Sequence, residues 1–147
     1  MNQHWSPSTI EERFSTFYDD LNLDTLSMLG DVYHPDVTFV DPVGSYQGLD
    51  HLDAYFRKLL SGNTDNHFVI EQLRFKDTIG FVTWRMNFTT PRLNRGRNIV
   101  VDGASAISVE NNLVSFQRDY YDLGSMVYEH VPVLRKIVRS IRTRMAL

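Results

Sequence analysis

The sequence predicts an α+β fold, in which N-terminal helices pack on one face of a strongly curved, antiparallel or mixed sheet and a further helix ends the chain. Two patterns predict it. Apolar residues recur mostly at helical spacing in residues 8–60 and mostly at alternate positions in residues 67–122. No Pro/Gly/Ser-rich linker, repeat or low-complexity tract interrupts the 147 residues, 42% of which are apolar. We therefore expect one domain, residues 1–147, with a single core.

Three helices are expected in the first half of the chain. Ser8 and Glu11 have the spacing of a capping box and start a helix over residues 8–21. A second helix over residues 24–33 ends before a His-Pro pair, because the residue before a proline avoids the helical region. A third helix, over residues 48–62, begins with acids and carries its basic residues late, as the helix dipole favours.

The strands are indicated by alternation and by turn residues. One short strand ends at Asp41, between the second and third helices. Beyond His67 the alternation changes parity near Glu71-Gln72, which predicts a bulge. The later strands are expected at residues 79–90, 98–109 and 113–122, the last two joined by a tight turn.

Asp41 is the first candidate for chemistry. Val37, Phe39 and Asp41 share one face of a strand that Pro42 and Gly44 end, so the carboxylate leaves the sheet beside apolar side chains. A carboxylate in such a place costs free energy unless it is hydrogen-bonded, protonated or used. Two interpretations stay open: an acid/base group, or a turn residue that accepts backbone N–H bonds.

Residues 81–88 supply two different surfaces. One face carries Thr83, Arg85 and Asn87, and the other carries Val82, Trp84, Met86 and Phe88. If Gln117, Asp119 and Tyr121 lie on the side of Arg85, that guanidinium can pair with Asp119. Such a pair would be either part of a site or a structural ion pair, and the opposite apolar face would need a cover.

The ionisable residues are distributed unevenly. All 18 acidic residues and ten of the 15 basic ones precede residue 130, so residues 1–129 carry a net charge of −8 while the tail is basic. The tail, residues 125–147, predicts a basic amphipathic helix, for which we weigh two arrangements: packed on its own protein with a solvated basic face, which we favour, or in weak contact with a membrane surface. Nucleic-acid binding is not expected, because the body is acidic.

Several classes of protein are disfavoured by composition. Zero Cys excludes disulfides and thiolate chemistry, and the five His lack the short spacing of helical metal sites, so neither a metal nor a cofactor is expected. The start of the chain lacks the basic and apolar stretches of a signal peptide, and no apolar run is long enough to span a bilayer. We expect a cytoplasmic protein.

Three segments carry a family resemblance: Asp41-Pro42-Val43-Gly44-Ser45, Arg85-x-Asn87, and Arg118-Asp119-Tyr120-Tyr121-Asp122. With the order of elements, they resemble the nuclear transport factor 2-like superfamily over roughly residues 8–124, in particular its SnoaL-like, limonene epoxide hydrolase and ketosteroid isomerase branches. The resemblance implies a cone-shaped sheet that encloses a pocket. It also implies a homodimer, in which a second subunit would cover the face of Trp84, Met86 and Phe88.

The resemblance implies catalytic roles for Asp119 and Asp41, with Arg85 as the orienting and charge-stabilising group. The remaining lining is expected from Phe14, Tyr18, Phe39, Asn87, Ser105, Gln117 and Tyr121. The guanidinium should keep Asp119 ionised, whereas the apolar setting should favour the protonated form of Asp41.

This sequence departs from both enzyme branches. Phe14 and Ser105 replace the Tyr and Asp of the ketosteroid isomerase oxyanion hole, so steroid isomerisation is not expected. Phe39 and Asp41 stand at the Tyr and Asn positions of the epoxide hydrolases, and Asn87 cannot act as an acid. We expect proton transfer, isomerisation, cyclisation or water addition on a small apolar molecule; the alternative is a non-catalytic small-ligand-binding or dimeric interaction module.

Overall fold

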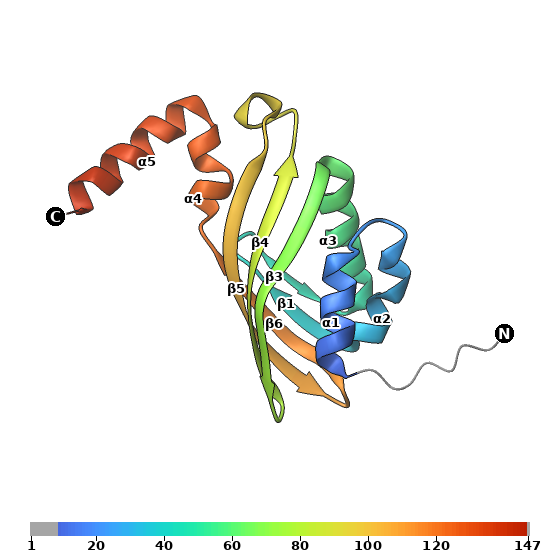
Figure 1. Cartoon of the computed structure of the whole chain (residues 1–147). Coiled ribbons are helices and arrows are strands. Elements are labelled where there is room, and N and C mark those ends of the chain that lie inside the picture. The colour runs from blue at the N-terminus through green and yellow to red at the C-terminus, as the bar shows by residue number, and fades with distance from the viewer. Residues whose placement is uncertain (1–8, 147) are drawn as a thin grey trace.

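A computed structural model describes residues 9–146 (Figure 1). The start of the chain, with the predicted cap Ser8, and Leu147 lie outside the described residues. In the described part of the chain, six strands form one mixed sheet in the order β2-β1-β6-β5-β4-β3, in which only β1 and β6 pair in parallel. The strands are β1 (Tyr33–Val40), β2 (Ser45–Gln47), β3 (Thr64–Lys76), β4 (Ile79–Thr89), β5 (Ile99–Glu110) and β6 (Leu113–Tyr121).

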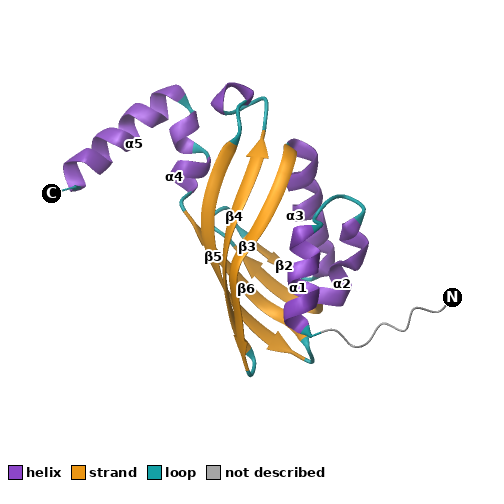
Figure 2. Cartoon of the chain, viewed as in Figure 1, coloured by secondary structure: helices purple, strands orange, loops and turns teal. Residues whose placement is uncertain are grey.

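The N-terminal helices lie together on one face of this curved sheet, so the predicted α+β class is confirmed (Figure 2). They are α1 (Ile10–Asp19), the 3₁₀ turn η1 (Thr25–Met28), α2 (Leu29–Val32) and α3 (Leu49–Gly62). The capping box of α1 is formed by Thr9 and Glu12, one residue later than predicted. The predicted second helix is reduced to η1 and α2, because Tyr33 already pairs as the first residue of β1.

Local sequence signals set the shape of the sheet. The register of β3 against β4 shifts between Ile70 and Gln72, where the change of parity predicted a bulge. Asn111 and Asn112 have φ values of 50° and 61°, the left-handed pair that a tight β5–β6 hairpin requires. The short strand β2 was not predicted; it pairs with β1 through the turn that follows Asp41.

The buried face of β4 is the reverse of the one expected. Trp84, Met86 and Phe88 are only 8%, 4% and 2% exposed, because their face of the sheet lies under the helices. The prediction that these residues form an outer dimer surface was therefore wrong. The helix-free face, here called the open face, carries Phe81, Arg85, Val100, Asp102 and Tyr120.

The C-terminal segment is broken into pieces. Asp122 caps α4 (Leu123–Met126) by accepting the Gly124 N–H at 2.8 Å; η3 (Tyr128–His130) follows, and α5 (Pro132–Met145) begins at a proline. Helix α5 has no buried residue and projects away from the sheet (Figure 1). The predicted basic C-terminal helix is thus present as α5, but it begins at Pro132 rather than at residue 125, and the prediction that it packs on the body was wrong. Within residues 9–146, no helix combines the length and apolarity needed to cross a bilayer.

Candidate active site

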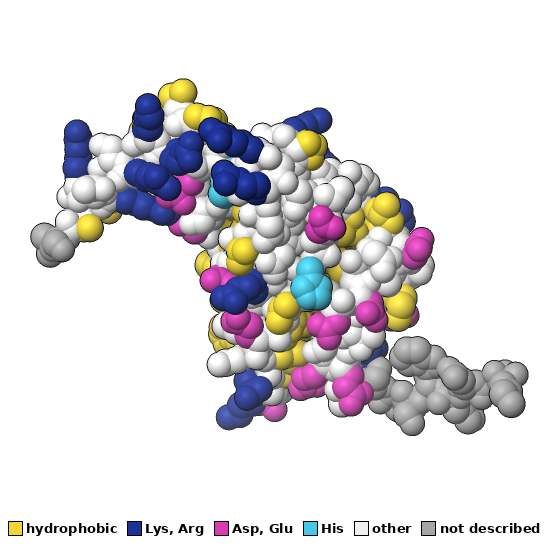
Figure 3. Space-filling view, turned by 45° about the horizontal axis from the view of Figure 1, so that its top comes forward, with side chains coloured by type: hydrophobic (Ala, Val, Ile, Leu, Met, Phe, Trp, Pro, Cys, Tyr) yellow, Lys and Arg dark blue, Asp and Glu magenta, His cyan; other side chains and the backbone are white. Residues whose placement is uncertain are grey.

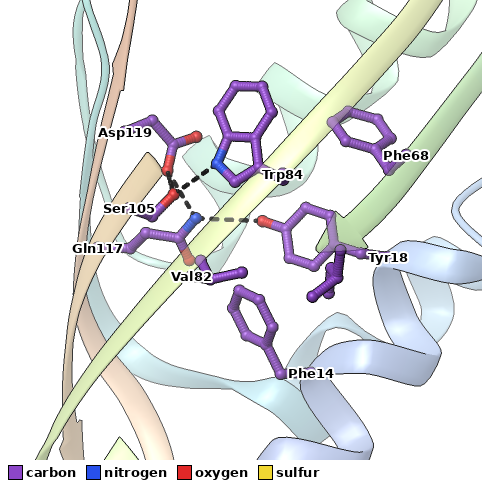
Figure 4. A pocket seen from close by; sticks show the side chains of 9 residues that line it. Phe14, Tyr18, Phe68, Val82, Trp84, Ser105, Gln117 and Asp119 are labelled. Atoms are coloured by element: carbon purple, nitrogen blue, oxygen red, sulfur yellow. Dashed lines mark hydrogen bonds between the residues drawn. The ribbon is translucent and has the colours of Figure 1, made fainter. Parts of the chain in front are cut away.

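The Asp119 side chain points into the helix-covered interior. It lies on β6 opposite Ser105 of β5, and opposed residues of antiparallel strands share a face. Its Oδ1 accepts the Ser105 hydroxyl at 2.6 Å and the Gln117 side-chain amide at 2.8 Å (Figure 4). The Trp84 indole N–H donates in turn to the Ser105 Oγ at 2.9 Å. One carboxylate oxygen is thus held in place, and no hydrogen bond to Oδ2 is recorded among the described residues.

Burial raises the pKa of Asp119 to about 6, against the hydrogen bonds from Ser105 and Gln117, which lower it. The negative charge of Asp41 contributes a smaller upward shift. This direction is opposite to the prediction, in which a guanidinium stabilised the charged form. At neutral pH the carboxylate is mostly ionised but close to its titration range, which suits a group that takes and returns a proton.

A ring of hydrogen bonds fixes the amide of Gln117. Tyr33 donates to the Gln117 Oε1 at 2.7 Å, Tyr18 and Tyr33 share a hydrogen bond of 2.6 Å, and the Gln117 Nε2 donates to the Tyr18 oxygen at 3.3 Å. Since the proton of Tyr33 goes to Gln117, Tyr18 donates to Tyr33. Burial raises the pKa of both phenols, so they stay neutral. The amide nitrogen of Gln117 is thereby directed toward Asp119.

Asp41 is a turn residue that also reaches helix α3. Its Oδ1 accepts the N–H groups of Val43 and Gly44 at 2.8 and 2.9 Å, and its Oδ2 accepts the Tyr55 hydroxyl at 2.7 Å. Of the two interpretations left open by the sequence, the structure supports the turn. The carboxylate also contacts the wall of the larger cavity: burial first, and then the charge of Asp41 and a hydrogen bond with it, raise the pKa of Tyr121.

Arg85 and Asn87 lie outside the interior. The Arg85 Nε is 2.7 Å from the Asp102 Oδ1, and its Nη2 is 3.8 Å from the Glu71 Oε1, all on the open face. Asn87 accepts a 3.4 Å hydrogen bond from Asn98. The predicted Arg85–Asp119 pair was therefore wrong, because Gln117, Asp119 and Tyr121 share the face of Trp84 rather than that of Arg85.

Two small cavities border Asp119, with volumes of about 20 and 30 Å³. Each is about large enough for one or two water molecules. Tyr18, Phe68, Trp84 and Asp119 line both cavities. The other predicted lining residues divide between them: Phe14, Ser105 and Gln117 border the smaller one, and Phe39 and Tyr121 border the larger one. Both spaces are bounded mainly by aromatic and aliphatic side chains.

Sequence reasoning missed three contributors to this site. Trp84 was assigned to the outer face, Tyr33 to the apolar stripe of a helix, and Tyr55 was not singled out. Tyr55 lies within the predicted third helix, one residue before the buried Phe56, and nothing in its spacing indicated a role in the site. The role of Trp84 could have been predicted from its chemistry: a buried indole N–H needs a hydrogen-bond acceptor, and Ser105, already expected in the pocket, offers one.

The comparisons with known proteins agree with this architecture. Residues 14–116 match the SnoaL-like domain, and the chain belongs to that family. No curated protein sequence matches the chain significantly.

Solved structures share the fold at low sequence identity. An NTF2-like protein of unknown function from Burkholderia pseudomallei K96243 has a TM-score of 0.72 at 16% identity, over 84% of this chain and 98% of that one. A hypothetical protein with a ketosteroid isomerase-like fold from Catenulispora acidiphila DSM 44928, in complex with trimethylamine, scores 0.69 at 16% identity, over 87% and 95%. A candidate SnoaL-like polyketide cyclase from Jannaschia sp. CCS1 scores 0.67 at 16% identity, over 85% and 94%.

Proposed function

We propose that this chain is an acid–base enzyme in which Asp119 relocates a proton within a small, mainly apolar substrate, by isomerisation or cyclisation. The observation that carries the proposal is the state of that carboxylate. Its pKa is raised to about 6, one oxygen is held by Ser105 and Gln117, and the side chain borders two apolar cavities. Perturbed carboxylates of this kind are typical of catalytic positions.

The proposed reaction follows from the side chains that line the two cavities: one carboxylate, that of Asp119, among mainly apolar groups. Asp119 would take a proton from a carbon next to a carbonyl group: the C–H bond breaks, an O–H bond forms on the carboxyl, and the electron pair moves to the carbonyl oxygen. Return of the proton to another carbon restores the carboxylate. A group with a pKa near neutrality serves both steps. Water addition by an Arg–Asp pair is not supported, because Arg85 lies on the open face.

Several residues next to Asp119 would position the carboxylate or the substrate without exchanging a proton themselves. Ser105 and Gln117 orient the carboxylate, and Tyr121 is a neutral phenol in the larger cavity, since burial raises its pKa. A neutral phenol can donate a hydrogen bond to developing negative charge. The cavities are small, so a substrate would displace part of their aromatic wall. The Catenulispora protein was crystallised in complex with trimethylamine, a molecule similar in size to the small substrates that we propose.

The alternative is a non-catalytic binding module. It is favoured by the closed ring of Tyr18, Tyr33 and Gln117, in which every hydroxyl proton is already used and none points at a ligand. Deuterium exchange separates the two functions, because a binding module gives saturable ligand binding without breaking a C–H bond.

The experiment is a screen of small ketones, lactones and enones in D₂O, followed by NMR for loss of protons next to the carbonyl. The intact chain should exchange them faster than buffer, and Asp119→Asn should lower the rate by about 100-fold or more, because general-base catalysis contributes that much. Asp53→Asn is the matched control: it removes a surface carboxylate of α3 that pairs with Arg57, lines neither cavity and lies off the open face, so it should leave the rate unchanged. Equal losses in both variants would contradict the assignment.

The same proposal includes a homodimer joined through the open face. It is supported by large apolar side chains that remain exposed on that face: Phe81 at 63%, Tyr120 at 53% and Val100 at 49%. Apolar surface gathered on one face is typical of an interface. The dimer expected from the family resemblance is kept, but its contact residues are changed.

We also propose that α5 contacts anionic membrane surfaces weakly. The supporting observation is an apolar stripe on an acid-free helix: Leu134, Ile137 and Ile141 are 40%, 51% and 53% exposed. Arginines flank this stripe, as in helices that lie in the membrane interface. The cytoplasmic location stays a prediction, which cell fractionation would test.

A further inference from the structure

A pocket outside the interior lies between the β4–β5 connection and the start of α5. Its volume is about 180 Å³, larger than either interior cavity. It is lined by Asn94, Arg95, Arg97, His130, Pro132 and Arg135, with no acidic side chain among them. Figure 3 shows Lys and Arg side chains gathered over this end of the molecule, in contrast to the acidic side chains lower on the same face.

The three arginines of this pocket are not neutralised. Arg95, Arg97 and Arg135 take part in none of the ion pairs found among the described residues. Arg142 takes both nearby acids, Asp122 and Glu129. Arg95, Arg97 and Arg135 therefore face one concavity without a carboxylate, in a chain whose net charge is −3. Positive charge concentrated in a concave site attracts anions.

The loop that presents two of these arginines is held by its own hydrogen bonds. Asn94, Arg95 and Gly96 have φ values of 52°, 56° and 72°, a left-handed turn that only glycine adopts freely. The turn is secured by the Arg97 N–H to the Asn94 carbonyl at 3.1 Å and by the Asn94 side chain to the Asn98 carbonyl at 3.2 Å. Arg95 and Arg97 thus project from a defined backbone.

The other wall of the pocket is equally defined. The His130 Nε2 lies 2.8 Å from the Ser125 carbonyl oxygen, to which it can donate, and this contact orients the imidazole. The Arg135 N–H donates to the Val131 carbonyl at 2.8 Å within the first turn of α5. Cationic groups therefore converge from two separate segments of the chain, at the point where α5 leaves the body.

We propose that this pocket binds a phosphate group, with Arg95, Arg97 and Arg135 as its ligands. Guanidinium groups offer planar, paired N–H donors that match phosphate oxygens. The single concavity takes one such group rather than a nucleic-acid strand, since the acidic body offers no continuous basic track. The phosphate belongs either to a soluble phosphate ester or to a lipid headgroup, and the test distinguishes these sources.

The site is independent of the proposed enzyme activity. No residue is shared between this pocket and the two interior cavities. Asp119→Asn should therefore bind phosphate as the unchanged chain does, and failure of either proposal leaves the other standing.

The test is calorimetric titration of the full chain with inorganic phosphate and with glycerol 3-phosphate at low salt. We expect saturable binding of one phosphate, weakened about tenfold or more by each of Arg95→Gln, Arg97→Gln and Arg135→Gln, since a hydrogen bond to a charged group contributes that much. Arg92→Gln and Lys136→Gln are matched controls, because each removes a neighbouring charge that does not line the pocket. They should weaken binding clearly less than the pocket substitutions do, because neither side chain can donate a hydrogen bond inside the pocket.

The lipid source is tested by co-sedimentation with vesicles of phosphatidylcholine alone or mixed with phosphatidic acid. Binding to the acidic vesicles that is lost on the three pocket substitutions, but kept in Arg92→Gln and Lys136→Gln, assigns the phosphate to a lipid headgroup. Saturable titration with soluble phosphates assigns it to a soluble ester. The absence of both kinds of binding, or an equal loss in the two controls, would overturn the proposal.

Discussion

Replacing Asp119 by Asn should stabilise the fold at neutral pH while removing the proposed activity. Asn is nearly the same size, and its Oδ1 can accept the same hydrogen bonds from Ser105 and Gln117. What the substitution removes is the cost of an ionised carboxylate enclosed beside an apolar cavity. That cost is the reason why the pKa of Asp119 lies above its ordinary value of 3.8.

The magnitude follows from the rise of the pKa from 3.8 to about 6. Each pKa unit corresponds to about 1.4 kcal/mol, so the ionised group lowers the free energy of unfolding by about 3 kcal/mol. The folded state keeps its proton at pH values where the unfolded chain has already lost it. The stability that this proton supplies is therefore fully present below pH 3.8 and is lost as the pH rises through about 6.

The assay is urea unfolding of both chains between about pH 4 and pH 8. The unfolding free energy of Asp119→Asn minus that of the unchanged chain should rise by about 2 kcal/mol over this range, because part of the full change falls below pH 4. Asp53→Asn is the control for removing a carboxylate elsewhere in the chain, and because its ion pair with Arg57 lies at the surface of α3 it should cost less than about 1 kcal/mol. A difference that stays constant with pH would refute the reasoning.

Three further perturbations test the interior, the open face and α5. Gly103→Ala would place a Cβ 2.3 Å from the Trp84 ring and should lower stability by about 1–3 kcal/mol; an unchanged melting temperature would contradict this packing. Phe81→Glu should convert the dimer to a monomer in light scattering, and its 63% exposure in the single chain means that the fold should survive; a monomer before substitution would reject the dimer. Leu134→Ser with Ile141→Ser should abolish co-sedimentation with anionic vesicles at low salt; binding that persists in this variant would show that the apolar stripe is not used.

The order of the elements could be predicted because its signals are local. A change of alternation marked the β3 bulge, two asparagines marked the β5–β6 turn, and the third helix was expected at residues 48–62, where α3 occupies Leu49–Gly62. Each signal depends on a few neighbouring residues, whose backbone preferences hold in almost any surroundings.

The candidate site was predicted only in part, because its residues come from separate strands and helices. Ser105, Gln117 and Asp119 were recognised on β5 and β6, but the partner of Asp119 was expected to be Arg85 and is instead a pair of neutral donors. Asp41 was expected as a second acid and is held in a turn by backbone N–H groups. Hydrogen-bond partners of this kind depend on the distances between separate strands and helices, which the order of residues along the chain does not reveal.

By itself, the sequence determined the class of fold and the alternation of the long strands, and it named Asp41 and Asp119 as candidate carboxylates. Only the tertiary structure decided which face of β4 is inside, since alternation separates Trp84 from Arg85 without saying which of them the helices cover. The same decision set the chemistry of Asp119. Once the helices enclosed the face of Trp84, Asp119 was left beside apolar cavities without a guanidinium, so desolvation raised its pKa and no neighbouring cation lowered it.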